Sequence, residues 1–224
     1  LAGELGERVK LFPADLSDRE AVKTLGQQAE ADLEGVDILV NNAGIARDGL
    51  FVRMSDEDWD AVLEVNLTSV FRLTRELTHP MMRRRYGRIV NITSVVAVTG
   101  NPGQANYGPA KSGIVTFSQI AAKELAQYGV VSNCVVPGAR TRLTMSSPGL
   151  PEIMEAPQGG FDVWAPANIS PVVGYLSGAD CPLTGQVFDV LEHVPLCLGI
   201  ESTGGFVEDK NLSVAHEGSG QRHF

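Results

Sequence analysis

Three apolar segments that end in polar residues, glycine or proline constrain the fold of this chain more than any other feature. They are VDILVNNAG (36–44), RIVNITS (88–94) and VVSNCVVPG (130–138). A β-rich run closed by such residues is typical of a strand that runs into a loop. We also predict a short first strand in RVKLFPADL (8–16) and a last strand in GQVFDV (185–190).

Helical segments separate these strands. The capping box SDRE (17–20) is expected to start the first helix, since the Ser17 hydroxyl and the Glu20 carboxylate can both satisfy free backbone amides. Further helices are expected over 55–85, 106–128 and 166–177. Strands that alternate with helices predict a single α/β domain, a Rossmann-like doubly wound parallel sheet that is covered on both faces.

The carboxyl ends of the strands are the expected place for a ligand, because sheets of this kind bind ligands beyond those ends. Polar or small residues stand there, namely Asp15, Asn41, Asn42, Ala43, Gly44, Ser94, Pro137 and Gly138. Since the ends of parallel strands meet at one edge, we expect a single crevice.

The composition argues against several classes of function. A net charge of −9 and a pI near 4.9 disfavour a nucleic-acid-binding protein, which needs a basic face. No apolar run approaches the roughly 18 residues of a membrane span, and Leu1 is not followed by a charged and then apolar leader, so we expect no membrane segment and no signal peptide. Three cysteines without CxxC spacing fit a reducing, cytoplasmic setting, and the scattered histidines suggest no metal site.

Two segments stand apart from this pattern. MMRRRYGR (81–88) packs four arginines into eight residues, which fits either a solvated helix end, where cations complement the helix dipole, or a docking patch for an acidic partner. Residues 196–224 are rich in glycine, serine and charged residues, so we expect a loose C-terminal tail that need not be ordered. The domain that precedes this tail is expected to span residues 1–195.

Tyr107 and Lys111 carry the chemistry that the sequence suggests. They stand four residues apart in NYGPAKSGIV (106–115), so on a helix they share a face. Tyrosine is a poor acid or base at neutral pH, because its reference pKa is about 10. A cation nearby favours the phenolate and lowers this pKa towards a range that suits general acid–base catalysis. Ser94 could hold a substrate oxygen beside the phenol.

Each of these residues also has a purely structural interpretation. The Tyr107 ring could simply pack on the Lys111 stem, and Ser94 could merely end a strand. Asn66, in LEVNLTSVF (63–71), is a poor helix former within an apolar helix and could cap a bend.

Taken in order, these features resemble the short-chain dehydrogenase/reductase family. The shared layout is NNAG (41–44), then Asn66, then Ser94 thirteen positions before Tyr107, then YxxxK and finally PG (137–138), over roughly residues 15–190. Within the family, DGLFVRMSDEDWDAVLEVNLTSVF (48–71) and GRIVNITSVVAVTGNPGQANY (87–107) look most like bacterial 3-oxoacyl-[acyl-carrier-protein] reductases.

The resemblance implies a role for each catalytic residue. Tyr107 would protonate the substrate carbonyl oxygen, and Ser94 would hydrogen-bond that oxygen. Lys111 would bind the nicotinamide ribose and lower the Tyr107 pKa, while Asn66 would hold a water that joins Lys111 to solvent. The implied reaction is the reduction of a 3-oxoacyl thioester, carried by acyl-carrier protein, with NADP(H) as cofactor and NAD(H) left open.

The resemblance also implies a cofactor site and an assembly. Asp15 and Leu16 would lie at the adenine. The residues along the adenosine ribose and the cofactor backbone would be Asn42, Ala43 and Gly44, and those beside the nicotinamide would be Pro137 and Gly138. A homo-oligomer, either a dimer or a tetramer, is expected.

One motif of the family is not found in this sequence. In the family, a Thr-Gly-x-x-x-Gly-x-Gly loop follows the first strand, and its glycines let a helix N-terminus approach the cofactor pyrophosphate. TGNPGQ (99–104) has a different spacing, and GSG (218–220) has no strand before it. By this resemblance Leu1 corresponds to a point just before the family's third strand. We therefore expect a sheet without its first two strands, and weak binding of NADPH or none at all.

Three functions stay open on the sequence alone. The complete set of Asn66, Ser94, Tyr107 and Lys111 favours a reductase of acyl-carrier-protein thioesters. The missing loop favours a truncated, non-catalytic homologue that acts as an interaction subunit. VFDVLEHVPLC (187–197) lacks the glycine pair that follows the family's last strand, which leaves open a reductase or dehydrogenase of other alcohols or of hydroxyacyl-CoA.

Overall fold

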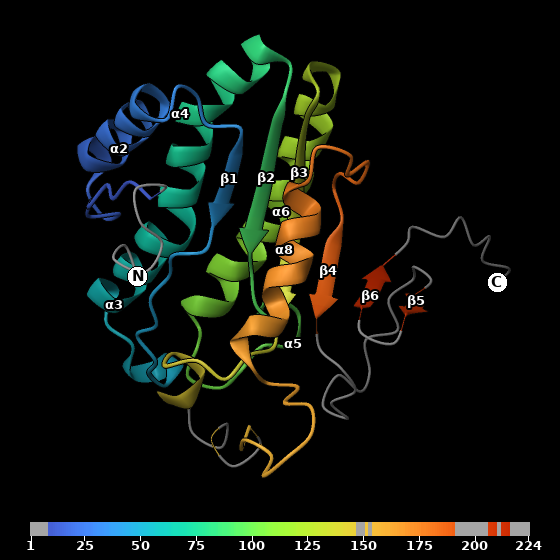
Figure 1. The fold of residues 1–224 in the computed structure, drawn as a ribbon. Coiled ribbons are helices and arrows are strands. Elements are labelled where there is room, and N and C mark those ends of the chain that lie inside the picture. The colour runs from blue at the N-terminus through green and yellow to red at the C-terminus, as the bar shows by residue number, and fades with distance from the viewer. Residues whose placement is uncertain (1–8, 147–150, 152–153, 191–205, 210–211, 216–224) are drawn as a thin grey trace, which may run out of the picture.

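Four parallel strands form the centre of the molecule. The computed structural model describes residues 9–146, 151, 154–190, 206–209 and 212–215. Within them β1 (Ile38–Asn41), β2 (Gly87–Ile92), β3 (Val130–Pro137) and β4 (Val187–Val190) lie side by side in chain order (Figure 1). Helices connect them, so the predicted α/β fold with a parallel sheet is confirmed.

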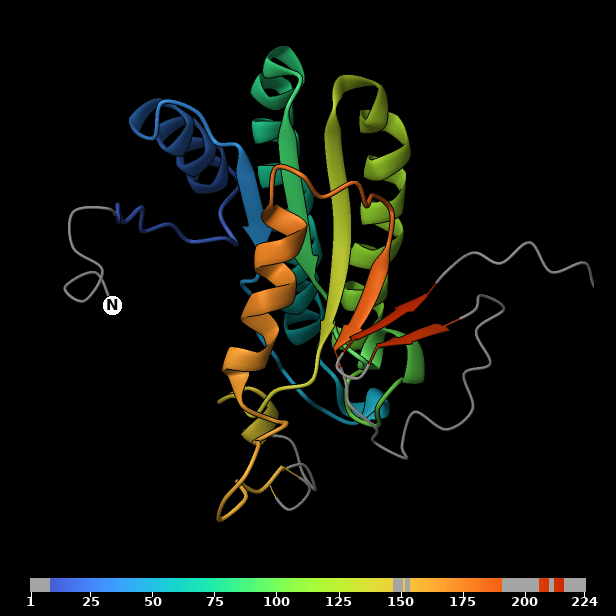
Figure 2. The same cartoon turned by 45° about the vertical axis from the view of Figure 1, so that its right-hand side comes forward.

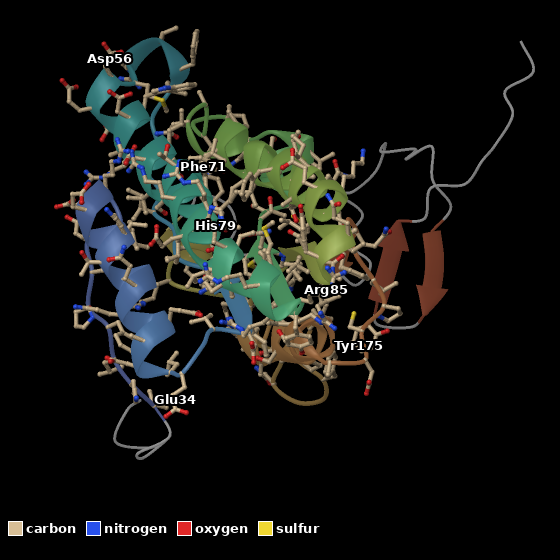
Figure 3. The ribbon with its side chains drawn as sticks, turned by 90° about the horizontal axis from the view of Figure 1, so that it is seen from above. Glu34, Asp56, Phe71, His79, Arg85 and Tyr175 are labelled. Carbon is tan, nitrogen blue, oxygen red and sulfur yellow. The ribbon has the colours of Figure 1, made fainter. Side chains whose placement is uncertain are left out.

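Helices cover both faces of this sheet. They are α2 (Arg19–Asp32), α3 (Asp56–Leu63), α4 (Ser69–Arg84), α5 (Val96–Thr99), α6 (Tyr107–Leu125) and α8 (Ser170–Ser177), with short helical turns η2 (Phe51–Arg53), η3 (Glu64–Thr68), η4 (Ala126–Tyr128), η5 (Thr144–Ser146) and η6 (Pro166–Ile169). α8 lies on one face, while α4 and α6 lie on the other and α2 packs outside α4 (Figures 2 and 3). None of the helices in the described ranges is both long and apolar enough to cross a membrane.

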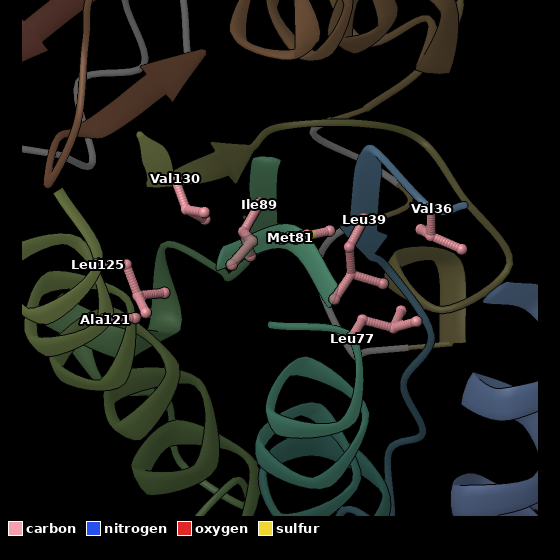
Figure 4. Close-up of a cluster of buried hydrophobic side chains, with 8 residues drawn as sticks. All are labelled: Val36, Leu39, Leu77, Met81, Ile89, Ala121, Leu125 and Val130. Carbon is pink, nitrogen blue, oxygen red and sulfur yellow. The ribbon is translucent and has the colours of Figure 1, made fainter. Parts of the chain in front are cut away.

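The alternation of side chains along β2 explains the two layers. Ile89 points to the α4 and α6 side, where it joins Leu39, Met81 and Leu125 in a buried cluster (Figure 4). Its neighbour Val90 points the other way and packs in a second cluster with Leu176 of α8. Because successive strand residues face opposite sides, apolar residues at every position bury both faces of a strand.

The edge of the sheet at β1 is less covered. Leu39 and Asn41 are buried against α4, but Ile38 and Val40 are 45% and 41% exposed. The strand that we predicted over 8–16 is wrong for residues 9–15, which have no strand pairing in the structure. A strand needs a neighbour for its backbone hydrogen bonds, and among the described residues β1 pairs only with β2.

Two further strands extend the opposite edge. β6 (Leu212–Ala215) pairs with β4 in antiparallel fashion, and β5 (Phe206–Asp209) pairs with β6. Both strands belong to the segment that we predicted as a loose tail, most of which lies outside the described residues. The division of the chain into a domain over 1–195 and a tail stays a prediction.

The first helix starts differently from our prediction. Asp18, not Ser17, caps α2, and its carboxylate accepts from the Glu20 and Ala21 amides at 2.7 and 3.2 Å. The Ser17 hydroxyl instead donates to the Asp15 carboxylate at 2.7 Å. Either residue type can cap a helix, and here the contact with Asp15 decides between them.

Arginines of the segment 81–88 make contacts with other parts of the same chain, although Arg84 and Arg85 are exposed. Arg84 pairs with Glu30 and Asp37, and its Nη2 group donates to the Val36 carbonyl. Arg85 ends α4 in the left-handed conformation and donates to the Gln127 carbonyl. Arg88, only 6% exposed, donates to the carbonyls of residues 178 and 179 at 3.1 and 2.7 Å. These three arginines hold helices and loops to the ends of strands.

Candidate active site

The carboxyl ends of β1, β2 and β3 meet at one edge of the sheet, as expected (Figure 1). β1 runs into Asn42, Ala43 and Gly44, which are exposed. β2 runs into Thr93 and Ser94, and β3 ends at Pro137 with Gly138 buried behind it. α6 begins at this same edge and supplies the other residues of the site.

Tyr107 is the first residue of α6. The Asn106 side chain caps the helix by accepting from the Tyr107 amide at 2.7 Å, and it donates to the Arg47 and Asp58 carbonyls. Pro109 falls in the first helical turn, where its missing amide costs no hydrogen bond. Tyr107 is buried, and the Ser94 side chain lies near enough to its phenol to act on the pKa of that group. The structure thus brings Ser94 and Tyr107 together.

The pKa of Tyr107 differs from our expectation. Burial raises the pKa of the phenol above its usual value of 10.0, the hydrogen bond with Ser94 lowers it, and the negative charge of Asp48 raises it. The net direction is upward, so the prediction of a lowered pKa is wrong for this structure. Desolvation disfavours the phenolate here more than the neighbouring groups favour it. At neutral pH the phenol is therefore protonated.

Lys111 lies one turn along α6 from Tyr107. Its Nζ atom is 5.7 Å from the centroid of the Tyr107 ring and donates to the Ile92 carbonyl at 2.9 Å. The side chain is 4% exposed, and burial lowers the pKa of the amine from 10.5 to about 8. Lys111 is therefore a buried cation held at the end of β2.

Asn66 is fully buried in the π-helical turn η3, between α3 and α4. Its Oδ1 accepts from the Ile45 amide at 2.8 Å, and its Nδ2 donates to the Ile45 carbonyl at 2.9 Å. Gly44 lies so close that a Cβ there would be 3.2 Å from Asn66 Oδ1 and 3.6 Å from Lys111 Nζ. Asn66 therefore ties the loop after β1 to the helix and brings Gly44 beside Lys111.

Asp15 and Leu16 stand just before α2. The Asp15 carboxylate accepts from the Ser17 amide and hydroxyl, and these hydrogen bonds lower its pKa. The side chain is exposed. The role of both residues at an adenine stays a prediction.

Asp48 and Gln104 also belong to this edge, although the sequence pattern does not single them out. Gln104 donates to both Asp48 oxygens, at 3.2 and 3.1 Å, although 56 residues separate the two. We considered TGNPGQ (99–104) only as a phosphate loop. Gln104 is a long polar residue beside the start of a predicted helix, which could have marked it as a candidate. Nothing in the sequence, however, indicates that its partner is Asp48.

A nicotinamide cofactor, which the resemblance implies, fits the residues at one end of this site. Lys111 Nζ has three donors, and among the described residues one of them is used, on Ile92. The others are available to hydroxyl oxygens near Tyr107. Asn42, Ala43 and Gly44 leave the end of β1 open on the same side, so the residues present suit a ribose and its neighbouring groups.

Comparison with known proteins independently supports the family resemblance that the sequence motifs indicate. The family model described as short chain dehydrogenase matches residues 1–148. Nodulation protein G of Rhizobium sp. (strain N33) is 74% identical over 138 residues, which are 62% of this chain and 56% of that protein. The 3-oxoacyl-[acyl-carrier-protein] reductase FabG of Vibrio cholerae is 37% identical over 191 residues, 83% of this chain and 78% of that protein. The FabG of Escherichia coli (strain K12) is 46% identical over 134 residues, 60% of this chain and 55% of that protein. The match thus spans little more than half the length of the nodulation protein.

Proposed function

The chain belongs to the short-chain dehydrogenase family, and on this premise we propose that it reduces a carbonyl group to an alcohol with a nicotinamide cofactor. The observation that carries the proposal is the group of Ser94, Tyr107 and Lys111 at the carboxyl ends of the strands. Ser94 follows β2 and the other two lie on α6, and the fold gathers all three beside the open end of β1.

Tyr107 is the proton donor in this proposal. Its pKa stands above the usual value, so the phenol is protonated at neutral pH and can give its proton to a carbonyl oxygen. Ser94 lies near the phenol and would hydrogen-bond the same carbonyl oxygen. A nicotinamide cofactor bound beside Lys111 would supply the hydride. Once the phenolate forms, the buried Lys111 ammonium, whose Nζ lies 5.7 Å from the centroid of the Tyr107 ring, would favour its negative charge.

Asn66 supports the site from behind. Its paired hydrogen bonds with Ile45 keep Gly44 close to Lys111 and so keep the loop after β1 in place. We assign it a positioning role, together with the water-holding role that the resemblance implies.

The proposed substrate is a 3-oxoacyl thioester carried by acyl-carrier protein, with NADPH as the reductant. Support comes from relatives named 3-oxoacyl-[acyl-carrier-protein] reductase in Vibrio cholerae and Escherichia coli. Hydroxyacyl-CoA and simple alcohols are the competing substrates. The intramolecular contacts of Arg84, Arg85 and Arg88 favour a structural role for the arginine-rich segment over a docking patch for the carrier.

Two measurements test the proposal. Titration with NADPH, followed by nicotinamide fluorescence, should saturate, and acetoacetyl thioester should then be reduced. Tyr107→Phe should abolish turnover while leaving NADPH binding within about threefold, because the phenol acts on the substrate. Tyr175→Phe, at an exposed position on α8, is the matched control and should keep full activity. Turnover that survives Tyr107→Phe would remove Tyr107 from its assigned role.

A second candidate, an interaction subunit without catalysis, has one observation in its favour. Among the described residues β1 pairs only with β2, and its side chains Ile38 and Val40 are exposed, so another chain could pair there. A flat NADPH titration together with a stable complex in size-exclusion chromatography would favour this candidate over the enzyme.

A further inference from the structure

Two loops at the candidate active site are joined by a pair of side chains that the proposed reaction does not use. The first loop follows β1 and contains Asp48, and the second precedes α6 and contains Gln104. Gln104 Nε2 donates to both carboxylate oxygens of Asp48, at 3.2 and 3.1 Å. Gln104 is only 8% exposed, so the hydrogen bonds to this charged acceptor are partly shielded from water.

The orientation of the Gln104 amide is fixed from its other side. Asn101 Nδ2 donates to Gln104 Oε1 at 3.1 Å, so both ends of the amide have partners. The Gly49 amide donates to the Gly103 carbonyl at 2.8 Å, and Gly49 forms an isolated parallel bridge with Gln104. Backbone and side chains therefore join the same two loops at adjacent points.

This junction lies directly before the residue proposed as proton donor. The Gln104 carbonyl accepts from the Gly108 amide at 2.9 Å, in the first turn of α6. Asn106 continues the contact, because it donates to the Arg47 carbonyl and accepts from the Tyr107 amide. A shift of either loop would therefore move the start of α6 and, with it, the Tyr107 phenol.

We propose that Asp48 and Gln104 are positioning residues, whose side chains clasp the loop after β1 to the loop before α6 and so set where Tyr107 stands relative to residues 42–44. The assignment of a catalytic consequence rests on the proposed function, whereas the clasp itself does not. The clasp therefore fixes the part of the site that contains Tyr107 relative to the part that contains Gly44.

The negative charge of Asp48 adds a second measurement, the pKa of Tyr107. A contact that only held the two loops together would not change this pKa. The groups facing the phenol are Ser94 from the loop after β2, Lys111 from α6 and Asp48 from the loop after β1. Burial raises the pKa of Tyr107, the Ser94 hydrogen bond lowers it and the Asp48 charge raises it. Removing that charge should therefore lower the pKa of Tyr107, even if the shape of the loop is kept.

The test uses the full chain and the variants Asp48→Asn and Gln104→Met. The side chain introduced by Asp48→Asn can still accept from Gln104 but carries no charge, whereas Gln104→Met fills similar space without hydrogen bonds. Glu124→Gln, at the far end of α6 on an exposed position, changes the net charge as Asp48→Asn does and serves as control. Ultraviolet titration of tyrosinate, with Tyr107→Phe to identify the signal of Tyr107, measures the phenol without any need for turnover.

Asp48→Asn should move the Tyr107 titration to lower pH, and Glu124→Gln should not. Gln104→Met should speed hydrogen exchange of the Gly49 and Gly108 amides by about tenfold or more, with global unfolding little changed. If the chain reduces acetoacetyl thioester, Gln104→Met should lower kcat by about tenfold to a hundredfold with a smaller change in KM, since misplacement of a reacting group acts on the chemical step.

Unchanged exchange in Gln104→Met would overturn the clasp, and an unmoved Tyr107 titration in Asp48→Asn would show that the clasp does not hold the Asp48 charge near the phenol. These two results do not depend on catalysis. If the Tyr107 titration moves and the exchange becomes faster but the chain shows no turnover, the clasp stands and the proposed function is wrong. If the chain turns over substrate but neither of these changes occurs, the proposed function stands and the clasp is wrong.

Discussion

The side-chain amide of Asn66 hydrogen-bonds both backbone groups of Ile45, with Oδ1 2.8 Å from N and Nδ2 2.9 Å from O. Ile45 lies in a loop, and the Asn66 amide satisfies both of its backbone groups as a neighbouring strand would. This pairing occurs at the π-helical turn η3, where the widened helix turns the amide towards the loop. A buried amide with both ends satisfied in this way is expected to be sensitive to the loss of either end.

Asn66→Asp is the first test of this relationship. The carboxylate can accept from the Ile45 amide but would place a negative oxygen against the Ile45 carbonyl in a fully buried site. We expect the free energy of unfolding at neutral pH to fall by about 3 kcal/mol. Burial raises the pKa of the new carboxyl, so stability should recover in acid and be lost as the pH rises through the folded-state pKa.

Denaturant unfolding of Asn66→Asp across the pH range measures this effect. Asn168→Asp is the control, because Asn168 also donates to backbone carbonyls, those of Asp162 and Val163, but lies nearer the surface. If both variants lost the same free energy of unfolding at every pH, the prediction that the buried site of Asn66 is the more sensitive one would be wrong.

Lys111 should cost stability below about pH 8. The amine titrates at 10.5 in the unfolded chain and at about 8 in the folded one, so the unfolded chain binds more protons between these values. By linkage, stability attributable to this group rises with pH across that window, and below it burial of the ammonium costs about 3 kcal/mol. Lys111→Met should therefore stabilise the fold at neutral pH by roughly 2 kcal/mol after the lost hydrogen bond to Ile92 is counted.

The measurement is denaturant unfolding of the parent protein and of Lys111→Met, below pH 8 and again towards pH 10.5. The advantage of Lys111→Met should shrink as the pH rises, while Lys123→Met, at an exposed position on the same helix, should show no such trend. A constant difference across the range would mean that the amine is not a buried cation in the native protein.

Much of this site could be predicted because its signals are local. Apolar runs that end in polar or small residues predict strands within 36–44, 88–94 and 130–138. The structure has strands at 38–41, 87–92 and 130–137, and their parallel pairing puts those ends together. Tyr107 and Lys111 share a face because of helical spacing. Ser55 was placed at the start of the long helix, and it does cap α3 by accepting from the Asp58 amide.

The errors arise where a distant or competing partner decides the outcome. Residues 9–15 have the composition of a strand but no neighbour to pair with among the described residues. Ser17 is drawn to Asp15, so Asp18 caps α2. The pKa of Tyr107 depends on burial, which spacing does not reveal, and Asp48 finds Gln104 only after the fold is formed.

Arg88→Met distinguishes a structural arginine from an exposed one within the same segment. Arg88 is buried and satisfies the carbonyls of Gly178 and Ala179, so its loss removes the donor from both acceptors. We expect a loss of about 2–4 kcal/mol in the free energy of unfolding, whereas Arg83→Met, at an exposed position, should stay within about 0.5 kcal/mol. Thermal and denaturant unfolding measure both, and equal effects would refute the structural assignment.

Gly129 should tolerate no side chain. It follows η4 with φ of 73°, and a Cβ there would stand 2.4 Å from the Arg85 carbonyl oxygen. That oxygen belongs to backbone at the end of α4, which is itself in the left-handed region at φ 55°, so it has little freedom to move aside. Gly129→Ala should therefore lower the free energy of unfolding by about 3 kcal/mol or more, through backbone strain and a steric clash together.

Gly174→Ala is the matched comparison, because the same methyl group enters open space. Gly174 lies inside α8, and in the described part of the chain no atom beyond its own helix backbone and chain neighbours lies within 4 Å of its Cβ position. Replacing glycine within a helix lowers the entropy of the unfolded chain, so this variant should gain roughly 0.5–1 kcal/mol. Denaturant midpoints that move in opposite directions would assign the difference to the contact with Arg85. A Gly129→Ala protein as stable as the parent would mean that the turn between α6 and β3 can open away from the end of α4.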